Sequence, residues 1–577
     1  MATIGEVNAK GTDTESKGEV EGLPYMLYFG VFFDGTSNNM IQKEAAKRIK
    51  QKQIRQLKKE SGSRLTSQQA EKHERLLLSA DEISDNFSNG ANRTVDLNGK
   101  EGVNKSDTKG YSNVGILHSL YQGMPAEEYP TDYNVKIYNV YVEGSGANVI
   151  MGDSTSERNM VGIAFGKGKT GVAYLTSKAL ELVLFRIKTI FNTIPRDLQH
   201  KTIVKFDVFG FSRGATCSRL FSYCVASDNE TLTESDLPCV KELRNSYLSA
   251  EYIDGDNIRL FKPTIDIKKK NITVEMLGIF DTVSSIGGIR LDSYRNNTRD
   301  YGLYSPSLKR VKHAFHICAM DEFRAHFALT DLGAAVTRHG EIFIPGCHSD
   351  VGGGYINSNA TTGPESFKVP YALKAVKKSP WDNDREPVHF QIAKSHVSRP
   401  DRTIDFIRYL RNYGFLGPTD DASYDSRSNC LWGNINDCTL IKAFGLVNAD
   451  ATVQRPSIAG YSNIPLEIMT LRSKADSGRE LFRSHKGLFD VSSDILKIFG
   501  GQGKLKELSE VKGKRQFYYP GGSWDSDSYK ALRKYLHFSG EWYAGNDIYY
   551  NGGTVRRIVY YGDRAESSMH FYQEYNL

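Results

Sequence analysis

The sequence contains no apolar run close to the ~18 uninterrupted residues that a membrane-spanning helix needs, so we expect no segment to cross a bilayer. Residues 1–23 are polar and include acidic side chains without an apolar core. We therefore expect neither a signal peptide nor a transit peptide there, but a disordered tail. A chain of this kind folds in a cytosol, and other machinery must carry it if it acts elsewhere.

Cysteine is also sparse, and the net charge is small. The seven cysteines are odd in number and scattered, whereas a disulfide framework is dense and even, so we expect mostly reduced thiols. A net charge of +6 over 577 residues is too small to indicate nucleic-acid binding. The thirteen histidines do not cluster, and no metal or other cofactor is predicted.

The sequence does contain several apolar runs that end at small or ionisable residues. Runs of this kind, flanked by turn residues, are typical of strands buried on both faces of a sheet. They cover residues 25–33, 135–142, 202–209, 272–280 and 341–344. Helical patterns at 171–191 and from Ala215 onward lie between them. This alternation predicts an α/β fold, a mostly parallel sheet with helices on both faces as in the α/β-hydrolases.

One of these runs ends in Gly210-Phe211-Ser212-Arg213-Gly214, which matches the G-x-S-x-G nucleophile elbow. The pattern requires glycines because a strand must turn sharply into a helix and leave the serine hydroxyl exposed above the sheet. Alone the match is weak, but a strand-like run precedes it and a helix-like segment follows. Ser212 is therefore the predicted nucleophile.

A serine hydroxyl needs a base, and the base needs an acid that orients it. In α/β-hydrolases the acid and then the base follow the serine at the ends of later strands. Asp281 and His348 fit this order and placement. Asp350 is an alternative acid, although it suits a bracing role in the following glycine loop. His348-x-Asp350 also resembles half a metal site, but no second ligand pair has suitable spacing.

The oxyanion formed by attack on an ester requires two backbone N–H donors. Arg213, directly after the serine, is the first predicted donor. The second is expected at Gly35 or Thr36, with residues 144–146 as an alternative. Asp34 is expected either to organise this loop or to bind an ion.

Four separated motifs together resemble one family. The sequence is similar over about residues 25–360 to the α/β-hydrolase domain of the type VI secretion lipase effectors of the first class. The motifs are Phe32-Phe33-Asp34-Gly35-Thr36-Ser37-Asn38-Asn39, Gly210-Phe211-Ser212-Arg213-Gly214-Ala215, Gly278-Ile279-Phe280-Asp281-Thr282-Val283 and Pro345-Gly346-Cys347-His348-Ser349-Asp350-Val351-Gly352-Gly353-Gly354-Tyr355. Residues 111–114 and 321–324 also resemble family positions.

The resemblance implies a phospholipase A type enzyme with a Ser212, Asp281 and His348 triad that cleaves acyl esters of membrane glycerophospholipids without a metal. It implies an antibacterial effector that is made in the bacterial cytoplasm and delivered into the periplasm or membrane of a target cell. The implied partners are the phospholipid membrane of that cell, a secretion spike protein and a cognate immunity protein. A cytosolic carboxylesterase on soluble esters and a non-catalytic scaffold are the alternatives.

Two regions depart from the family pattern. Residues 24–365 are the predicted catalytic domain, interrupted by a basic helical insertion at about 40–108. Within it, residues 41–75 carry eleven Lys or Arg and four Glu, a charge of +7. This segment suits either a solvated helix or a surface for anionic lipid or an acidic partner. Residues 366–577 are predicted to form a cap or docking region.

Overall fold

In the computed structural model, most of residues 20–36, 111–146, 171–286, 308–354 and 459–533 can be described. The gaps inside these spans are residues 262–266, 268, 323, 325–326 and 485–489. The shorter described pieces are residues 3–6, 38, 95–96, 102–103, 300–303, 390–391, 423–425, 430–432, 438–441, 450–453, 535–537, 550–551, 554–560 and 569–576. The predicted basic segment 41–75 lies outside them.

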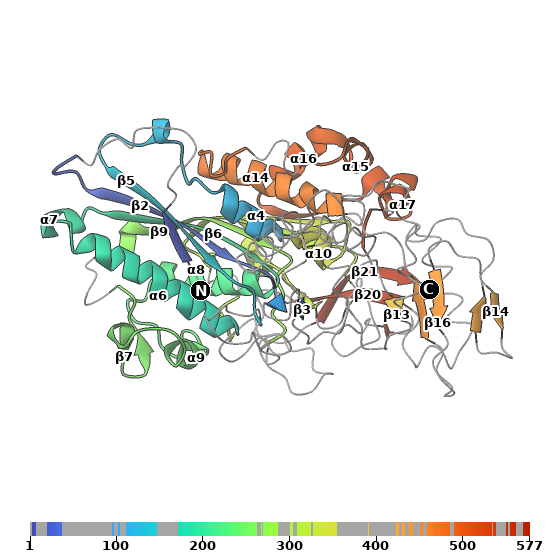
Figure 1. The fold of residues 1–577 in the computed structure, drawn as a ribbon, viewed down its shortest axis with the longest axis horizontal. Coiled ribbons are helices and arrows are strands. Elements are labelled where there is room, and N and C mark those ends of the chain that lie inside the picture. The colour runs from blue at the N-terminus through green and yellow to red at the C-terminus, as the bar shows by residue number, and fades with distance from the viewer. Residues whose placement is uncertain are drawn as a thin grey trace, which may run out of the picture.

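The described chain is organised around one eight-stranded sheet (Figure 1). Its strand order is β1-β5-β2-β6-β9-β10-β12-β18. All neighbours pair in parallel except β1 with β5, which are antiparallel. The strands are β1 (Thr3–Glu6), β5 (Asn134–Val142), β2 (Tyr25–Phe33), β6 (Ile203–Phe211), β9 (Ile272–Phe280), β10 (Val311–Ala319), β12 (Gly340–Ile344) and β18 (Lys514–Phe517). The predicted α/β class is therefore confirmed.

The bounds of the apolar runs agree closely with the bounds of five strands. β2 and β9 have the predicted bounds, and β5, β6 and β12 differ by one or two residues at an end. Three strands of this sheet were not predicted. β10 lies between β9 and β12, β18 forms one edge, and β1 forms the other edge inside the tail that was predicted to be disordered.

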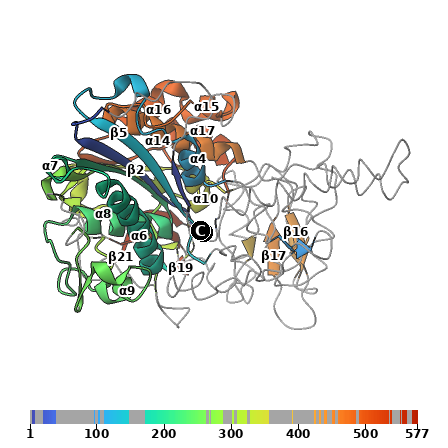
Figure 2. The same ribbon diagram turned by 60° about the vertical axis from the view of Figure 1, so that its left-hand side comes forward.

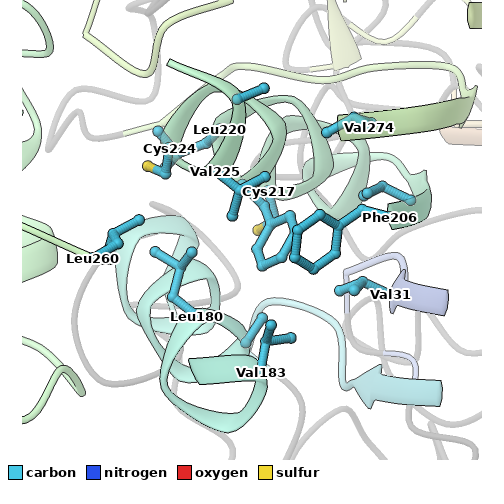
Figure 3. Packing of buried hydrophobic residues seen from close by; sticks show 14 of the residues in the cluster. Val31, Leu180, Val183, Phe206, Cys217, Leu220, Cys224, Val225, Leu260 and Val274 are labelled. Carbon is cyan, nitrogen blue, oxygen red and sulfur yellow. The ribbon is translucent and has the colours of Figure 1, made fainter. Parts of the chain in front are cut away.

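One face of the sheet is covered by two helices from the middle of the chain. These are α6 (Val172–Phe191) and α8 (Arg213–Ala226). Leu180 and Val183 of α6 and Leu220 of α8 lie in one apolar cluster with Phe206 of the sheet (Figure 3). All four side chains are fully or almost fully buried, and the cluster continues through the rest of this layer. Burial of this apolar surface is what holds the two helices to the sheet.

The other face is covered largely by residues beyond the predicted domain boundary at 365 (Figures 1 and 2). α4 (Asn113–Leu120) precedes it, but α14 (Asn463–Ser477), α15 (Ser493–Phe499), α16 (Gly501–Ser509) and α17 (Asp527–Arg533) follow it. Their apolar side chains form one buried cluster with those of β9, β10 and β12. Together with β18, these residues complete the same sheet and core that the catalytic motifs occupy.

A buried ion pair ties this C-terminal layer to the sheet. Asp207 of β6 is fully buried and accepts bonds from Arg479 Nη2 at 3.2 and 3.3 Å and from the Tyr121 hydroxyl at 2.9 Å. Burial raises the pKa of Asp207, and the Arg479 charge opposes that effect. The sequence pattern around Asp207 did not predict its pairing with Arg479, because the two residues are far apart in the chain.

A second, four-stranded sheet lies beside the ends of the central strands. It consists of β11 (Leu329–Thr330), β20 (Thr554–Tyr560), β19 (Tyr550–Asn551) and β21 (Met569–Asn576). The remaining strands are β3 (Val95–Asp96), β4 (Gly102–Val103), β7 (Ile253–Asp254), β8 (Asn257–Ile258), β13 (Phe390–Gln391), β14 (Ser423–Asp425), β15 (Cys430–Trp432), β16 (Cys438–Ile441) and β17 (Asp450–Val453). The remaining helices are α7 (Arg196–Gln199), α9 (Val240–Arg244) and α10 (His348–Gly352), with short 3₁₀ turns η3 (Ala126–Glu128), η5 (Ala250–Tyr252), η6 (Lys269–Asn271), η9 (Gly333–Thr337), η11 (Ala459–Ser462) and η12 (Pro520–Gly522).

Two further expectations concern these described residues. The structure describes the side chains of five of the seven cysteines, and all five are buried free thiols: Cys217, Cys224, Cys239, Cys318 and Cys347. No helix in the described part of the chain is both long and apolar enough to span a bilayer.

Candidate active site

Ser212 stands at a strained turn between β6 and α8. Its backbone has φ 61° and ψ −127°, a region that L-residues rarely adopt. Gly210 and Gly214 make the turn possible because there is no room for a side chain. A Cβ on Gly210 would lie 2.2 Å from Ser218 Oγ, and one on Gly214 would lie 2.3 Å from two backbone carbonyl oxygens of the 33–34 segment. The glycines of the motif are thus required by close packing.

The loop that carries Asp281 is bonded directly to this turn. The Ser212 N–H donates to the Phe280 carbonyl at 3.1 Å, and the Val283 N–H donates to the Ser212 carbonyl at 3.2 Å. Asp281 has φ 42°, and it and Ser212 are the two non-glycine residues with positive φ in the described chain. Backbone strain of this kind persists only where the surrounding structure fixes it, and it gathers at functional sites.

Asp281 and His348 form a buried pair. His348 Nδ1 lies 2.6 Å from Asp281 Oδ2, and the Ala319 N–H donates to Oδ1 at 2.9 Å. Arg557 of β20 adds a third contact, since its Nη2 lies 3.0 Å from each carboxylate oxygen. A carboxylate accepts only, so the His348 proton is on Nδ1, and Nε2 carries the lone pair. This is the tautomer that a serine base requires.

The charges around the pair favour an ionised acid and a neutral base. Burial alone would raise the pKa of Asp281, but Arg557 and the bond from His348 hold that pKa below its usual range. Burial lowers the pKa of His348, and the pairing with Asp281 opposes this only in part. At neutral pH the imidazole is therefore unprotonated and able to accept a proton.

The His348 ring is held between two aromatic rings. The Phe211 ring lies 4.5 Å away between centroids, which places the histidine beside the residue that precedes Ser212. The Phe327 ring meets it edge-on at 4.9 Å. The backbone N–H of His348 donates to Glu322 Oε2 at 3.1 Å. Glu322 is buried and pairs with Arg324, whose guanidinium also lies over the Phe327 ring.

Asp350, the alternative acid, has other partners. Its Oδ2 accepts from the Cys347 N–H at 3.0 Å, and its Oδ1 lies 2.6 Å from His537 Nδ1. The His537 N–H also donates to Oδ2 at 2.8 Å. Asp350 thus closes the first turn of α10 and ties it to a C-terminal segment. It does not contact the His348 side chain, so the geometry favours Asp281 as the acid.

The predicted oxyanion donors lie at the ends of β2 and β6. The Gly35 N–H already donates to Asp34 Oδ1 at 2.7 Å, which leaves Thr36 as the better second donor beside Arg213. The alternative, Gly144, packs directly on Gly35, since a Cβ there would lie 1.6 Å from the Gly35 carbonyl oxygen.

Asp34 itself organises this loop. The Ser112 hydroxyl donates to its Oδ1 at 2.5 Å, and the Tyr141 hydroxyl donates to its Oδ2 at 2.6 Å. With the Gly35 N–H, three donors therefore converge on one carboxylate that is almost fully buried. These bonds support the first of the two roles expected for Asp34, the organisation of the loop.

One group of potential metal ligands occurs near the site, among the described residues. Atoms of His316, Cys318 and Glu341 lie within 4.8 Å of one another. Their polar atoms are already engaged, because His316 Nδ1 lies 2.9 Å from Glu341 Oε1 and its Nε2 accepts from the Thr282 N–H at 3.1 Å. Burial raises the pKa of the Cys318 thiol well above its usual value. The arrangement braces the residue after Asp281 and does not resemble an open metal site.

A known family model matches the part of the chain that contains these site residues. Residues 186–373 match the family model for the catalytic domain of Tle1-like phospholipase effectors of the type VI secretion system. The resemblance inferred from the motifs is thereby confirmed over this range, which contains Ser212, Asp281 and His348. The motif at residues 32–39 lies outside it. A comparison with curated proteins found no match.

Two solved structures are similar at low identity. The Tle1 effector bound to the VgrG spike of the type VI secretion system is 19% identical with a TM-score of 0.45, over 94% of this chain and 91% of that chain. An uncharacterized protein from Pseudomonas aeruginosa is 15% identical with a TM-score of 0.29, over 86% of this chain and 65% of that one. We base the functional inference below on the family match and on the geometry of the site.

Proposed function

We propose that this chain, with its Tle1-like catalytic domain, is a serine phospholipase that hydrolyses acyl esters of membrane glycerophospholipids. The observation that carries the proposal is the buried Asp281–His348 pair at 2.6 Å, beside a serine held in a strained elbow. The family match to phospholipase effectors supports a lipid ester as the substrate. No cofactor enters the proposed reaction.

In the proposed reaction, His348 Nε2 takes the proton of the Ser212 hydroxyl while Oγ attacks the ester carbonyl carbon. The oxygen of the tetrahedral intermediate accepts bonds from the backbone N–H groups of Arg213 and Thr36. His348 then returns the proton to the leaving alkoxide, which departs as a lysophospholipid. Water, activated by the same histidine, hydrolyses the acyl-serine and releases the fatty acid.

We further propose that the enzyme is an antibacterial effector of the type VI system. The match to the catalytic domain of phospholipase effectors of the type VI secretion system supports delivery into target cells. A spike protein and an immunity protein are therefore the proposed protein partners, and the target membrane is the proposed substrate surface. No role for nucleic acid is proposed.

The test is fatty-acid release from phospholipid vesicles by the purified full chain, with Ser212→Ala beside it and a chelator in a third reaction. The proposal expects release that persists with the chelator and is lost with Ser212→Ala. Release that survives the loss of Ser212 would refute the assigned nucleophile.

Short-chain soluble esters, measured in parallel, separate the alternatives. Hydrolysis of these esters without vesicle hydrolysis would favour a cytosolic carboxylesterase. Turnover of neither substrate by a folded protein would favour a scaffold.

A further inference from the structure

Arg557 reaches the active site from the far end of the chain. It lies in β20, 276 residues beyond Asp281, and its side chain is 2% exposed. One nitrogen, Nη2, contacts both carboxylate oxygens of Asp281 at 3.0 Å. No sequence motif pointed to it, because sequence analysis assigned this part of the chain only to a cap or docking region. β19 and β20 pair there as antiparallel strands.

Backbone pairing fixes β20 against the loop of the acid. β20 pairs in parallel with β11, with Leu329 opposite Val559 and Thr330 opposite Tyr560. The Thr330 N–H in turn donates to the Thr282 carbonyl at 2.9 Å. A continuous run of backbone contacts thus leads from the residue after Asp281, through β11, to the strand that carries Arg557. The position of the guanidinium is therefore set by the fold.

The remaining donors of Arg557 argue against a purely structural role. Its Nε and Nη1 atoms are buried and have no hydrogen-bond partner among the described residues. A buried guanidinium with unused donors costs stability, since it has lost water without full compensation. The contact that Arg557 does make is to the proposed catalytic acid.

We propose that Arg557 is a positioning residue that orients the Asp281 carboxylate and balances its charge, so that the C-terminal hairpin completes the active site. The proposal rests on the proposed function. Arg557 does not contact the substrate, and it acts through Asp281 on His348. It follows that the chemistry depends on the docking of residues 554–560 on β11.

Other charged and titratable groups also face the Asp281–His348 pair. Glu322 and Arg324 lie on the His348 side, where their opposite charges pair with each other. Cys318 of β10 lies close to Asp281, and the Cys318 thiol is protonated because burial raises its pKa. His316 bonds to Glu341 and to the residue after Asp281. Among the described residues, Arg557 is the cation that contacts the acid directly. Its removal leaves the Asp281 carboxylate with the bonds from the Ala319 N–H and the neutral His348 but with no cation in contact.

The expected consequence is a shift in pH dependence with a definite sign. Without Arg557, the unbalanced Asp281 carboxylate stabilises the protonated His348 more strongly, and Asp281 itself is protonated more readily. Both changes reduce the population of ionised acid with neutral base at low pH. The acidic limb of Ser212 reactivity should therefore move to higher pH. A loss of packing alone would lower the plateau and leave the limb where it is.

The experiment measures the rate at which a fluorophosphonate probe labels Ser212 across about pH 5 to 8, the range in which histidine titrates. Arg557→Met removes the charge and keeps much of the length, and Arg557→Lys restores the charge. Arg479→Met is the matched control, because it breaks a buried pair with Asp207 away from the site. We expect the limb to move upward for Arg557→Met, to return toward the wild-type position for Arg557→Lys, and to stay in place for Arg479→Met.

The outcomes separate this inference from the proposed function. Labelling of the wild type with an unshifted limb in Arg557→Met would overturn the role of Arg557 and leave the serine hydrolase standing. Absence of labelling in the wild type would instead contradict the proposed function. In that event NMR titration of the His348 imidazole still tests the inference, and an equal titration midpoint in wild type and Arg557→Met would refute it. Arg557→Gln also removes the charge, and it keeps the test available if Arg557→Met does not fold.

Discussion

Replacement of Asp281 by Asn should separate the catalytic role of this carboxylate from its structural role. The backbone does not confound the change, because Asp281 has φ 42° and Asn is the side chain that best tolerates positive φ after Gly. The Asn oxygen can keep the bond from the Ala319 N–H. Its NH₂ group then faces His348 Nδ1, where a donor meets a donor. The histidine must move its proton to Nε2, and it can no longer act as the base.

The expected loss of activity follows from the tautomer. In serine hydrolases the equivalent change lowers kcat by roughly 10⁴, which corresponds to about 5 kcal/mol of transition-state stabilisation. The assay is hydrolysis of a soluble ester, with Ser212→Ala as the baseline. A variant within tenfold of the wild type would show that Asp281 does not set the tautomer of His348.

The same variant should also lose stability through Arg557. That guanidinium contacts both oxygens of Asp281, and it would be left buried without a counter-charge on its main partner. Breaking one half of a buried pair costs about 3–5 kcal/mol. The double variant Asp281→Asn with Arg557→Met removes both charges, so it should recover much of the stability in urea unfolding while remaining inactive. The coupling would be refuted if the double variant lost as much stability as the sum of the losses in the two single variants.

Three further predictions follow from the described contacts. Burial lowers the pKa of His348, so the base stays neutral as pH falls below the ordinary histidine value of about 6.5. The acidic limb of kcat/KM should therefore lie below that pH, and a limb above it would contradict the assignment of His348 as the base. Gly214→Ala should lower stability by about 2 kcal/mol or more and abolish turnover, since its Cβ would lie 2.3 Å from backbone oxygens, whereas Gly503→Ala in α16, with open space around it, is the control. A chain that ends at residue 365 loses β18 and α14, so it should not yield soluble folded protein; a cooperative unfolding transition in that fragment would refute the shared core.

The sequence predicted those parts of the fold whose signal is local. A strand buried on both faces is mostly apolar, which is why the bounds of β2 could be read directly, and also those of β9 despite its Thr273 and Glu275. The elbow was equally readable, because close packing demands glycine on both sides of Ser212. The order of acid and base then followed from the placement of Asp281 and His348 at strand ends.

Two of the missed strands, β10 and β18, contain polar residues with distant partners. β10 contains His316, which is fully buried and lies 2.9 Å from Glu341 of β12. β18 is four residues long, and its Arg515 pairs with Glu341 and with Asp331. Polar residues interrupt an apolar run, and the bonds that allow their burial connect positions far apart in the chain. Pattern reading therefore discards such strands, although they lie within the sheet.

The two strained residues connect these observations. Ser212 and Asp281 both have positive φ, and a conformation that costs of order 1–3 kcal/mol persists only where neighbours fix it. The groups that bind the Asp281 side chain come from β10, α10 and β20. No motif indicated the contact from β10, and the contact from β20 lies beyond residue 365. The site therefore cannot be separated from the C-terminal third that sequence analysis assigned to a cap. A catalytic motif identifies the reacting residues, and the rest of the chain holds them in conformations that they would not adopt alone.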